Sequence, residues 1–299
     1  MTLTAADLKQ TLRELLAYLE RGNCVLFLGA GVHAPPPQDS PYDYPEAHRL
    51  PLGGDLAEQL SEAFGFVTHE QFQGESPRDL QRVALFVETN FGRSALVNFL
   101  DEQLKKNRKP SPILRMLAEM PFKIFVTTNY DRLLEKALAA CDKEPENFVY
   151  NPDSSERTPD MLDDPSRENP LLFKMHGDLQ KRESIVITDE DYITFVQRMS
   201  DKDAVHPVPQ TVRYRMQKWP TLFFGYSLRD YNLRLLFRTL RWRVDPANFP
   251  LSYSVDNHPD PLIQKVWQEK RDLIAFVTEN LWTFVPYLYK EIMGKEFSP

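Results

Sequence analysis

Four short apolar runs in this 299-residue chain stop abruptly at glycine or small polar residues, and this pattern constrains the fold most strongly. A short apolar run that ends in this way is typical of a buried strand in a parallel sheet. Because the carboxyl ends of parallel strands meet at one edge of a sheet, we expect the residues after the runs to gather there. Those residues are Gly29-Ala30-Gly31, Thr127-Thr128-Asn129-Tyr130-Asp131, Met175-His176-Gly177-Asp178 and Gly225-Tyr226-Ser227.

Helical periodicity separates the apolar runs along the chain. The strand runs are 24–28, 123–126, 171–174, 185–187, 221–224 and 251–255. Helical patterns cover 8–20, 54–64, 77–89, 93–106, 110–119, 130–140, 189–199, 207–217, 230–241, 261–278 and 281–291. Strands that alternate with helices predict an α/β fold, here a Rossmann-like, doubly wound and mostly parallel sheet with an inserted helical module.

The spacing of the runs also predicts how the chain is divided. The gap between the first two strand runs is too long for one crossover helix, so we assign 53–120 to an inserted helical module. Residues 188–218 are predicted to form a second, small helical insertion, within a single domain that spans 1–299. The proline-rich stretch 34–51 and the polar stretch 150–169 are predicted to be loops.

Charge and cysteine content exclude several classes of protein. The net charge of −7 argues against a surface that binds nucleic acid throughout, so we expect no direct nucleic-acid binding. Two cysteines are too few for a disulfide framework or a four-cysteine zinc site, and no other metal-ligand spacing is present. The start has no basic and apolar leader, and no stretch is long and apolar enough to cross a membrane. We therefore expect a soluble, cytoplasmic protein.

Each strand end, taken alone, has both an ordinary and a functional interpretation. The glycine turn either closes a plain strand-to-helix connection or leaves room for a phosphate near backbone N–H groups. Asn129 and Asp131 either cap the following helix or contact a ligand. His176 is either a hydrogen-bonded structural histidine or a general base. Similarly, His33 is either an exposed loop residue or a contact to phosphate. Ser227 either caps a helix together with Asp230 or contacts a ligand.

The order of these segments resembles the sirtuin family, and more closely its prokaryotic sirtuin-like branch in phage defence. The matching residues run from about 22 to 241: Gly29-Ala30-Gly31, Leu50-Pro51, Thr128-Asn129-Tyr130-Asp131, His176-Gly177-Asp178, and Gly225-Tyr226-Ser227-Leu228 with Asp230, Asn232, Leu233 and Arg234. The resemblance implies that NAD is bound as a substrate and that no metal takes part. It implies catalytic roles for Asn129, which orients ribose or water, and for His176, the general base. It further implies an NAD-binding set of Gly29, Ala30, Gly31, Thr128, Asp131, Gly225, Tyr226 and Ser227.

The departures from the family are also informative. The zinc ribbon of protein-deacylating sirtuins needs four cysteines, and Val32-His33 stands where a Ser or Thr usually follows the glycine turn. The resemblance therefore favours an NAD+ glycohydrolase that releases nicotinamide and ADP-ribose as an effector of abortive infection. An NAD-dependent protein deacylase and a non-catalytic nucleotide-binding sensor are the alternatives. Since an enzyme that depletes NAD must be restrained, we expect a homo-oligomer or a complex with a separate sensor, ATPase or nucleic-acid-guided protein.

Overall fold

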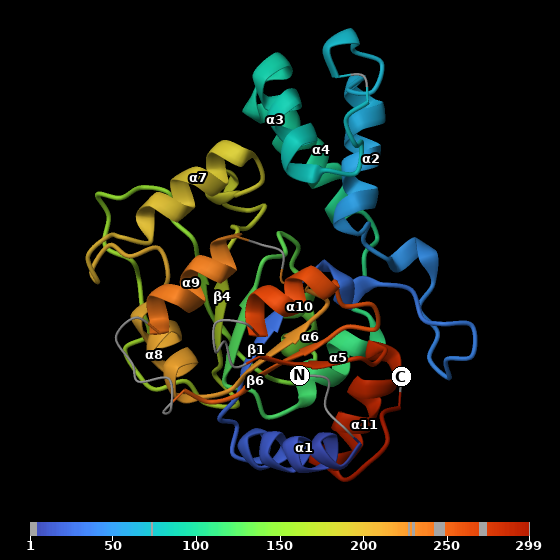
Figure 1. The fold of residues 1–299 in the computed structure, drawn as a ribbon, viewed down its shortest axis with the longest axis vertical. Helices are drawn as coiled ribbons and strands as arrows, with labels where there is room; N and C mark the ends of the chain where they lie inside the picture. The colour runs from blue at the N-terminus through green and yellow to red at the C-terminus, as the bar shows by residue number, and fades with distance from the viewer. Residues whose placement is uncertain are drawn as a thin grey trace.

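The apolar runs pair with one another in a computed structural model of the chain (Figure 1). The structure describes residues 5–72, 74–226, 228, 231–241, 249–268 and 274–298. The strands are β1 (Val25–Leu28), β2 (Ile124–Thr127), β3 (Glu146–Val149), β4 (Leu171–Lys174), β5 (Thr221–Phe224), β6 (Ser252–Val255) and β7 (Ile274–Val277). Within the described residues they form one seven-stranded sheet in the order β3-β4-β2-β1-β5-β6-β7. All of its pairings are parallel, which confirms the predicted α/β fold class.

Helices connect the strands and cover both faces of the sheet. The α-helices are α1 (Ala5–Glu20), α2 (Gly53–Phe64), α3 (Leu80–Phe91), α4 (Arg93–Lys105), α5 (Pro112–Glu119), α6 (Leu133–Ala139), α7 (Asp189–Arg198), α8 (Gln210–Lys218), α9 (Tyr231–Arg241), α10 (Pro261–Gln268) and α11 (Leu281–Met293). Short 3-10 helices occupy Ala30–His33, Glu46–His48, Glu70–Phe72 and Arg182–Ser184. The remainder of 34–51 has no regular structure, as the prolines predict.

The alternation of side chains along each strand builds two cores. Val25 and Phe27 of β1 belong to the core under α7, α8, α9 and α10. Leu26 and Leu28 belong to the opposite core, with residues of α1, α5, α6 and α11. Successive side chains of a strand point to opposite faces, so a strand buried on both faces is apolar throughout. This explains why continuous apolar runs, rather than alternating ones, predicted these strands.

The strand order places a crevice at the carboxyl end of β1. This strand pairs with β2 on one side and with β5 on the other, and the chain extends the sheet in both directions from there. Ligands of doubly wound sheets bind at such a point of reversal, outside the carboxyl ends of the strands. The segments that follow β1, β2, β4 and β5 therefore share one edge.

Helices α2, α3 and α4 form a cluster that stands beyond this edge of the sheet (Figure 1). Helix α5 differs, because it packs on α6 and α11 within the layer that covers the sheet. The helix begins at Pro112. The hydroxyl of the preceding residue, Ser111, caps it by accepting from the N–H of Leu114 at 3.1 Å. The second predicted insertion, 188–218, contains α7 and α8. The division of the chain into these modules stays a prediction.

One predicted strand is wrong, and two strands were missed. The run 185–187 is not a strand, because side chains and a turn bind its backbone: the N–H of Val186 donates to the carbonyl of His176, and the N–H of Ile187 donates to Asp191. Strand β3 was missed because it is an edge strand with two exposed polar residues. Strand β7 lies inside the stretch 261–278 that was predicted to be one helix, of which only 261–268 is helical among the described residues.

Among the described residues, no helix has the length and apolar character that crossing a bilayer requires.

Candidate active site

Four strand ends border one cavity of about 330 Å³ at the edge of the sheet. This volume lies within the range of roughly 300–1,000 Å³ that is usual for small-molecule sites. The polar wall comes from the segments after β1, β2, β4 and β5, and the apolar wall comes from Leu50, Pro51 and Leu52 before α2 and from α2, α3 and α4. The polar wall contains Ala30, Gly31, His33, Thr128, Asn129, Tyr130, Asp131, His176, Gly225 and Tyr226. Tyr192 of α7 completes this side of the cavity.

The glycine turn after β1 packs against the turn after β5. The N–H groups of Gly29 and Gly31 donate to the carbonyls of Phe224 and Gly225, at 3.0 and 2.9 Å. Gly225 has a φ of +63°, and a Cβ there would lie 2.3 Å from the backbone nitrogen of Val32. Glycine is therefore required here by the close approach of two backbones. The amides of Gly29 and Gly31 are already engaged, so they do not form the phosphate cradle that a plain glycine turn offers.

The turn after β2 presents Asn129 and Asp131 to a buried histidine. Nε2 of His33 lies 3.5 Å from Oδ2 of Asp131 and 3.4 Å from Nδ2 of Asn129. Burial alone would raise the pKa of the Asp131 carboxyl. The His33 imidazole, the Lys174 ammonium and the N–H of Leu133 outweigh it and hold that pKa below its ordinary value. Asp131 is therefore a carboxylate that only accepts hydrogen bonds.

Asn129 and Asp131 also share one short turn. Oδ1 of Asp131, which precedes the N-cap residue Arg132, accepts from the N–H of Leu133 at 2.8 Å and so satisfies the first N–H of α6. The N–H of Asn129 donates to the hydroxyl of Thr127 at 3.1 Å. Both interpretations of Asp131, helix cap and cavity residue, are therefore compatible.

A buried lysine, Lys174 at the end of β4, holds two of the strand ends together. Its ammonium, which is fully buried, donates to the carbonyl of Asp131 at 2.5 Å and to Oδ2 of Asp178 at 2.8 Å. It also lies 3.3 Å from Oε1 of Glu135. We call Lys174, Glu135 and Asp178 the lysine cluster. Since Asp131 follows β2 and Asp178 follows β4, the lysine cluster fixes the Asn129 turn relative to the His176 turn.

His176 is buried at 3% exposure and lines the cavity. The hydroxyl of Tyr192 lies 3.4 Å from its Nδ1, and the two rings meet edge to face with centroids 5.2 Å apart. Asp178, two residues on, uses its oxygens elsewhere: Oδ2 accepts from Lys174 and Oδ1 accepts from the N–H of Gln180. The ring is therefore oriented from the α7 side by Tyr192.

The helical cluster supplies an aliphatic wall opposite the polar residues. Its contribution is Leu52, Gly53 and Leu56 at the start of α2, Leu80 at the start of α3 and Leu104 near the end of α4. Arginines on both sides link this cluster to the His176 side, and Arg182 donates to Oδ1 of Asn98 in α4. Arg93, the first residue of α4, pairs with Asp191 of α7 at 2.8 Å and donates to the carbonyl of Ile185.

Most of the predicted site residues meet at this cavity. Asn129, His176, Ala30, Gly31, Thr128, Asp131, Gly225 and Tyr226 line it. Gly29 packs against the backbone of Gly225 beside the cavity, and Ser227 lies outside the described residues. Sequence reasoning missed Tyr192 and Lys174. Lys174 carried a weak signal, as a charged residue in an otherwise apolar strand, whereas nothing in the local pattern singles out Tyr192.

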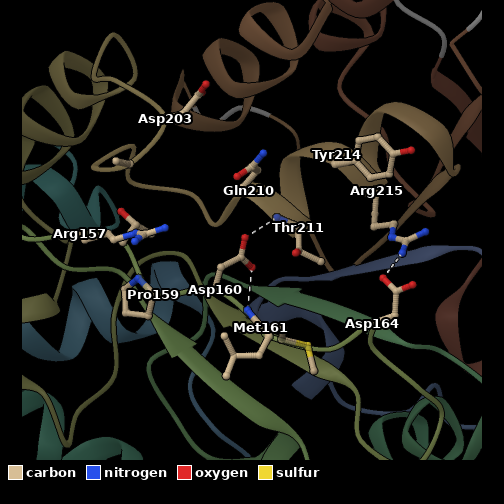
Figure 2. A pocket seen from close by; sticks show the side chains of 13 residues that line it. Arg157, Pro159, Asp160, Met161, Asp164, Asp203, Gln210, Thr211, Tyr214 and Arg215 are labelled. Carbon is tan, nitrogen blue, oxygen red and sulfur yellow. Dashed lines mark hydrogen bonds and ion pairs between the residues drawn. The ribbon is translucent and has the colours of Figure 1, made fainter.

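Two other hollows have larger volumes than the cavity at the strand ends. A larger hollow, of about 810 Å³, lies between the loop around Asp160 and helix α8; Figure 2 shows the side chains that line it. Asp160 accepts there from the N–H groups of Met161 and Thr211, and Arg215 pairs with Asp164 (Figure 2). A third hollow, of about 610 Å³, borders α6 and shares Leu104, Tyr130 and Asp131 with the cavity at the strand ends. Neither contains Asn129 or His176, so convergent chemistry rather than size identifies the site.

Metal ligands do not gather in the part of the chain that the structure describes, where no group of three or more His, Cys, Asp or Glu could hold an ion.

Comparison with known proteins identifies the family. The family model of the SIR2-like domain matches residues 123–274, just over half of the chain. An NAD(+) hydrolase ThsA of Enterococcus faecium is 26% identical over 238 residues, which are 79% of this chain and 44% of that protein. Defense-associated sirtuin 2 of Bacillus subtilis is 24% identical over 276 residues, which are 91% of this chain and 24% of that protein. The chain thus spans less than half the length of these curated relatives. The match to the family model shows that the chain belongs to the SIR2-like domain family.

Proposed function

We propose that this chain is an NAD+ hydrolase, which cleaves NAD+ to nicotinamide and ADP-ribose as an effector of anti-phage, abortive-infection defence. One observation carries the proposal: Asn129 and His176, on neighbouring strand ends, line one cavity at the switch point of the sheet. The names of the relatives, NAD(+) hydrolase and defense-associated sirtuin, support the reaction and its setting.

The chemistry of the bond suits these residues. Cleavage of an N-glycosidic bond passes through a transition state that resembles an oxocarbenium ion. The electron pair of the C1′–N bond moves to the pyridinium nitrogen, so nicotinamide leaves as a neutral molecule and needs no proton. Water then forms the new bond to C1′, and we assign the acceptance of its proton to His176. Asn129 can donate to and accept from a ribose hydroxyl or the water, which orients the reacting atoms.

The remaining polar wall is assigned to binding NAD. Six of these residues line the cavity: Ala30, Gly31, Thr128, Asp131, Gly225 and Tyr226. Gly29 packs against the backbone of Gly225 beside the cavity. The ionised carboxylate of Asp131 favours a positively charged group nearby, as the nicotinamide ring is before cleavage. We retain Ser227 in the binding set on the basis of the family resemblance alone.

The test is to incubate the purified chain with NAD+ and no acylated substrate and to measure nicotinamide and ADP-ribose by chromatography. Asn129→Ala and His176→Ala should each abolish turnover and preserve the melting temperature. His258→Ala is the matched control, because His258 is exposed and does not line the cavity. NAD+ consumption that requires an acetyl-lysine peptide would instead identify a deacylase. Binding without turnover, including in lysate from phage-infected cells, would identify a nucleotide sensor.

We further propose that the protein acts in the cytoplasm and is restrained by assembly. An enzyme that removes NAD must stay inactive until it is triggered, so we expect a homo-oligomer or a complex with a separate sensor, ATPase or nucleic-acid-guided protein. Light scattering of the purified chain, and affinity purification from cells before and after infection, test this expectation. A monomer that is fully active without a trigger would contradict it.

A further inference from the structure

His33 is part of the polar wall rather than an exposed loop residue. Its side chain is 2% exposed and lines the cavity between the glycine turn and the Asn129 turn. Nε2 is 3.5 Å from a carboxylate oxygen of Asp131 and 3.4 Å from the side-chain nitrogen of Asn129. The other ring nitrogen, Nδ1, is buried and has no hydrogen-bond partner among the residues that the structure describes.

These neighbours determine which ring nitrogen carries the proton when the imidazole is neutral. Asp131 can only accept, so the nitrogen that faces it must donate. A proton on Nδ1 would instead bury a donor that has no protein acceptor, which is unfavourable. Both considerations place the hydrogen on Nε2.

The hydrogen on Nε2 in turn constrains the amide of Asn129. Two N–H groups cannot bond to one another, whereas the amide oxygen and nitrogen occupy nearly equivalent positions about the Cβ–Cγ bond. With Nε2 protonated, the stable arrangement turns Oδ1 of Asn129 toward His33 and turns the NH2 group away from it. Asn129 makes no other side-chain hydrogen bond within the described part of the chain, so its NH2 group is available to a ligand in the cavity.

We propose that His33 is a positioning residue that fixes the Asn129 amide with its NH2 group toward the substrate. Asn129 then donates to an oxygen of the ribose or of the attacking water, and it does not serve as an acceptor there. The identity of that ligand rests on the proposed function, whereas the orientation of the amide and the position of the proton are properties of the free protein.

A matched set of substitutions tests the proposal. The amide of His33→Gln lies near the position of Nε2 and can supply the same donor, while the amide of His33→Asn lies near the position of Nδ1 and cannot. We expect His33→Gln to keep kcat for NAD+ cleavage close to that of the unchanged protein. We expect His33→Asn and His33→Phe to lower kcat about ten- to hundredfold with little change in KM, because they misorient a reacting group. Equal losses in all three variants, or no loss in His33→Phe, would overturn the proposal.

A second measurement does not depend on turnover. Nitrogen-15 NMR of protein labelled at histidine reports which ring nitrogen carries the proton, and the His33→Phe spectrum assigns the signal. We expect the Nε2–H form of His33 in the unchanged protein and a mixture of tautomers in Asp131→Asn. The Nδ1–H form in the unchanged protein would refute the positioning role even if NAD+ is cleaved. If NAD+ is not cleaved but the Nε2–H form is present, the proposed function fails while the arrangement of His33 stands.

Discussion

Replacing Lys174 by methionine is the sharpest test of what holds the site together. The ammonium is fully buried and bonds to the carbonyl of Asp131 and the carboxylate of Asp178, with Glu135 at 3.3 Å. Methionine matches the length of the side chain but leaves Asp178, which is at least 90% buried, without its cation, and leaves Glu135 with only its ion pair to Arg132 at 3.2 Å.

The magnitude follows from the burial of these partners. Removing one member of a buried ion pair typically costs about 3–5 kcal/mol, because the remaining charge is left uncompensated. At about 2 °C per kcal/mol, the low end for large domains, the melting temperature should fall by about 6–10 °C. NAD+ cleavage should also fall, because the Asn129 and His176 turns lose their common anchor.

Thermal and urea denaturation of three variants separates this explanation from ordinary loss of packing. The combined variant Lys174→Met/Asp178→Asn removes the carboxylate charge that Lys174→Met leaves without a cation, and it should recover most of the loss. Lys290→Met is the surface control, because its ion pair with Glu296 is exposed and should contribute no resolvable stability. A loss below about 1 kcal/mol in Lys174→Met, or an equal loss in the combined variant, would falsify the reasoning.

Three further expectations concern stability. Burial and a nearby arginine charge lower the pKa of His206 to about 4, so the unfolded chain binds a proton first as the pH falls. Stability should therefore drop by up to about 3 kcal/mol between roughly pH 6.5 and 4 in urea titrations, and His206→Gln should lack this pH dependence. Gly225→Ala should unfold at a much lower temperature than Gly53→Ala, because its Cβ would meet the nitrogen of Val32 at 2.3 Å while the Gly53 site is open; equal melting temperatures would contradict this. Ser111→Ala should lose about 1–2 kcal/mol in urea unfolding, since the hydroxyl is buried and caps α5; an unchanged midpoint would contradict it.

Local sequence pattern was enough to predict the central part of the sheet. The apolar runs of β1, β2, β4 and β5 are buried on both faces, and such strands are recognisable without knowledge of their partners. Because these strands are parallel, their carboxyl ends lie at one edge of the sheet. The prediction failed where the partner strand, rather than the strand's own sequence pattern, determines the conformation. Strand β3 has exposed Glu146 and Asn147, and its strand character comes from its partner β4.

The chemistry of the site could be predicted less completely than the fold. Asn129 and His176 follow strands, so the sequence places them at the correct edge. The partners of these residues come from other segments: Tyr192 of α7 for His176, and His33, beyond the glycine turn, for Asn129. Lys174, within a strand, binds the neighbouring residue Asp131. Residue type at one position does not reveal such contacts. The run 185–187 shows the same limit, because Arg93, Asp191 and the His176 turn bind its backbone in place of a neighbouring strand.

The two walls of the cavity are encoded by separate stretches of the chain. Asn129 and His176 follow strands whose positions are set by the whole sheet, whereas the facing leucines lie just before α2 and on α2, α3 and α4, between β1 and β2. Leu52 and Leu80, which are only partly buried, can therefore differ in size without moving the turns that carry Asn129 and His176. Proteins with this architecture are free to diverge in which ligands they admit while keeping the same residues at the strand ends.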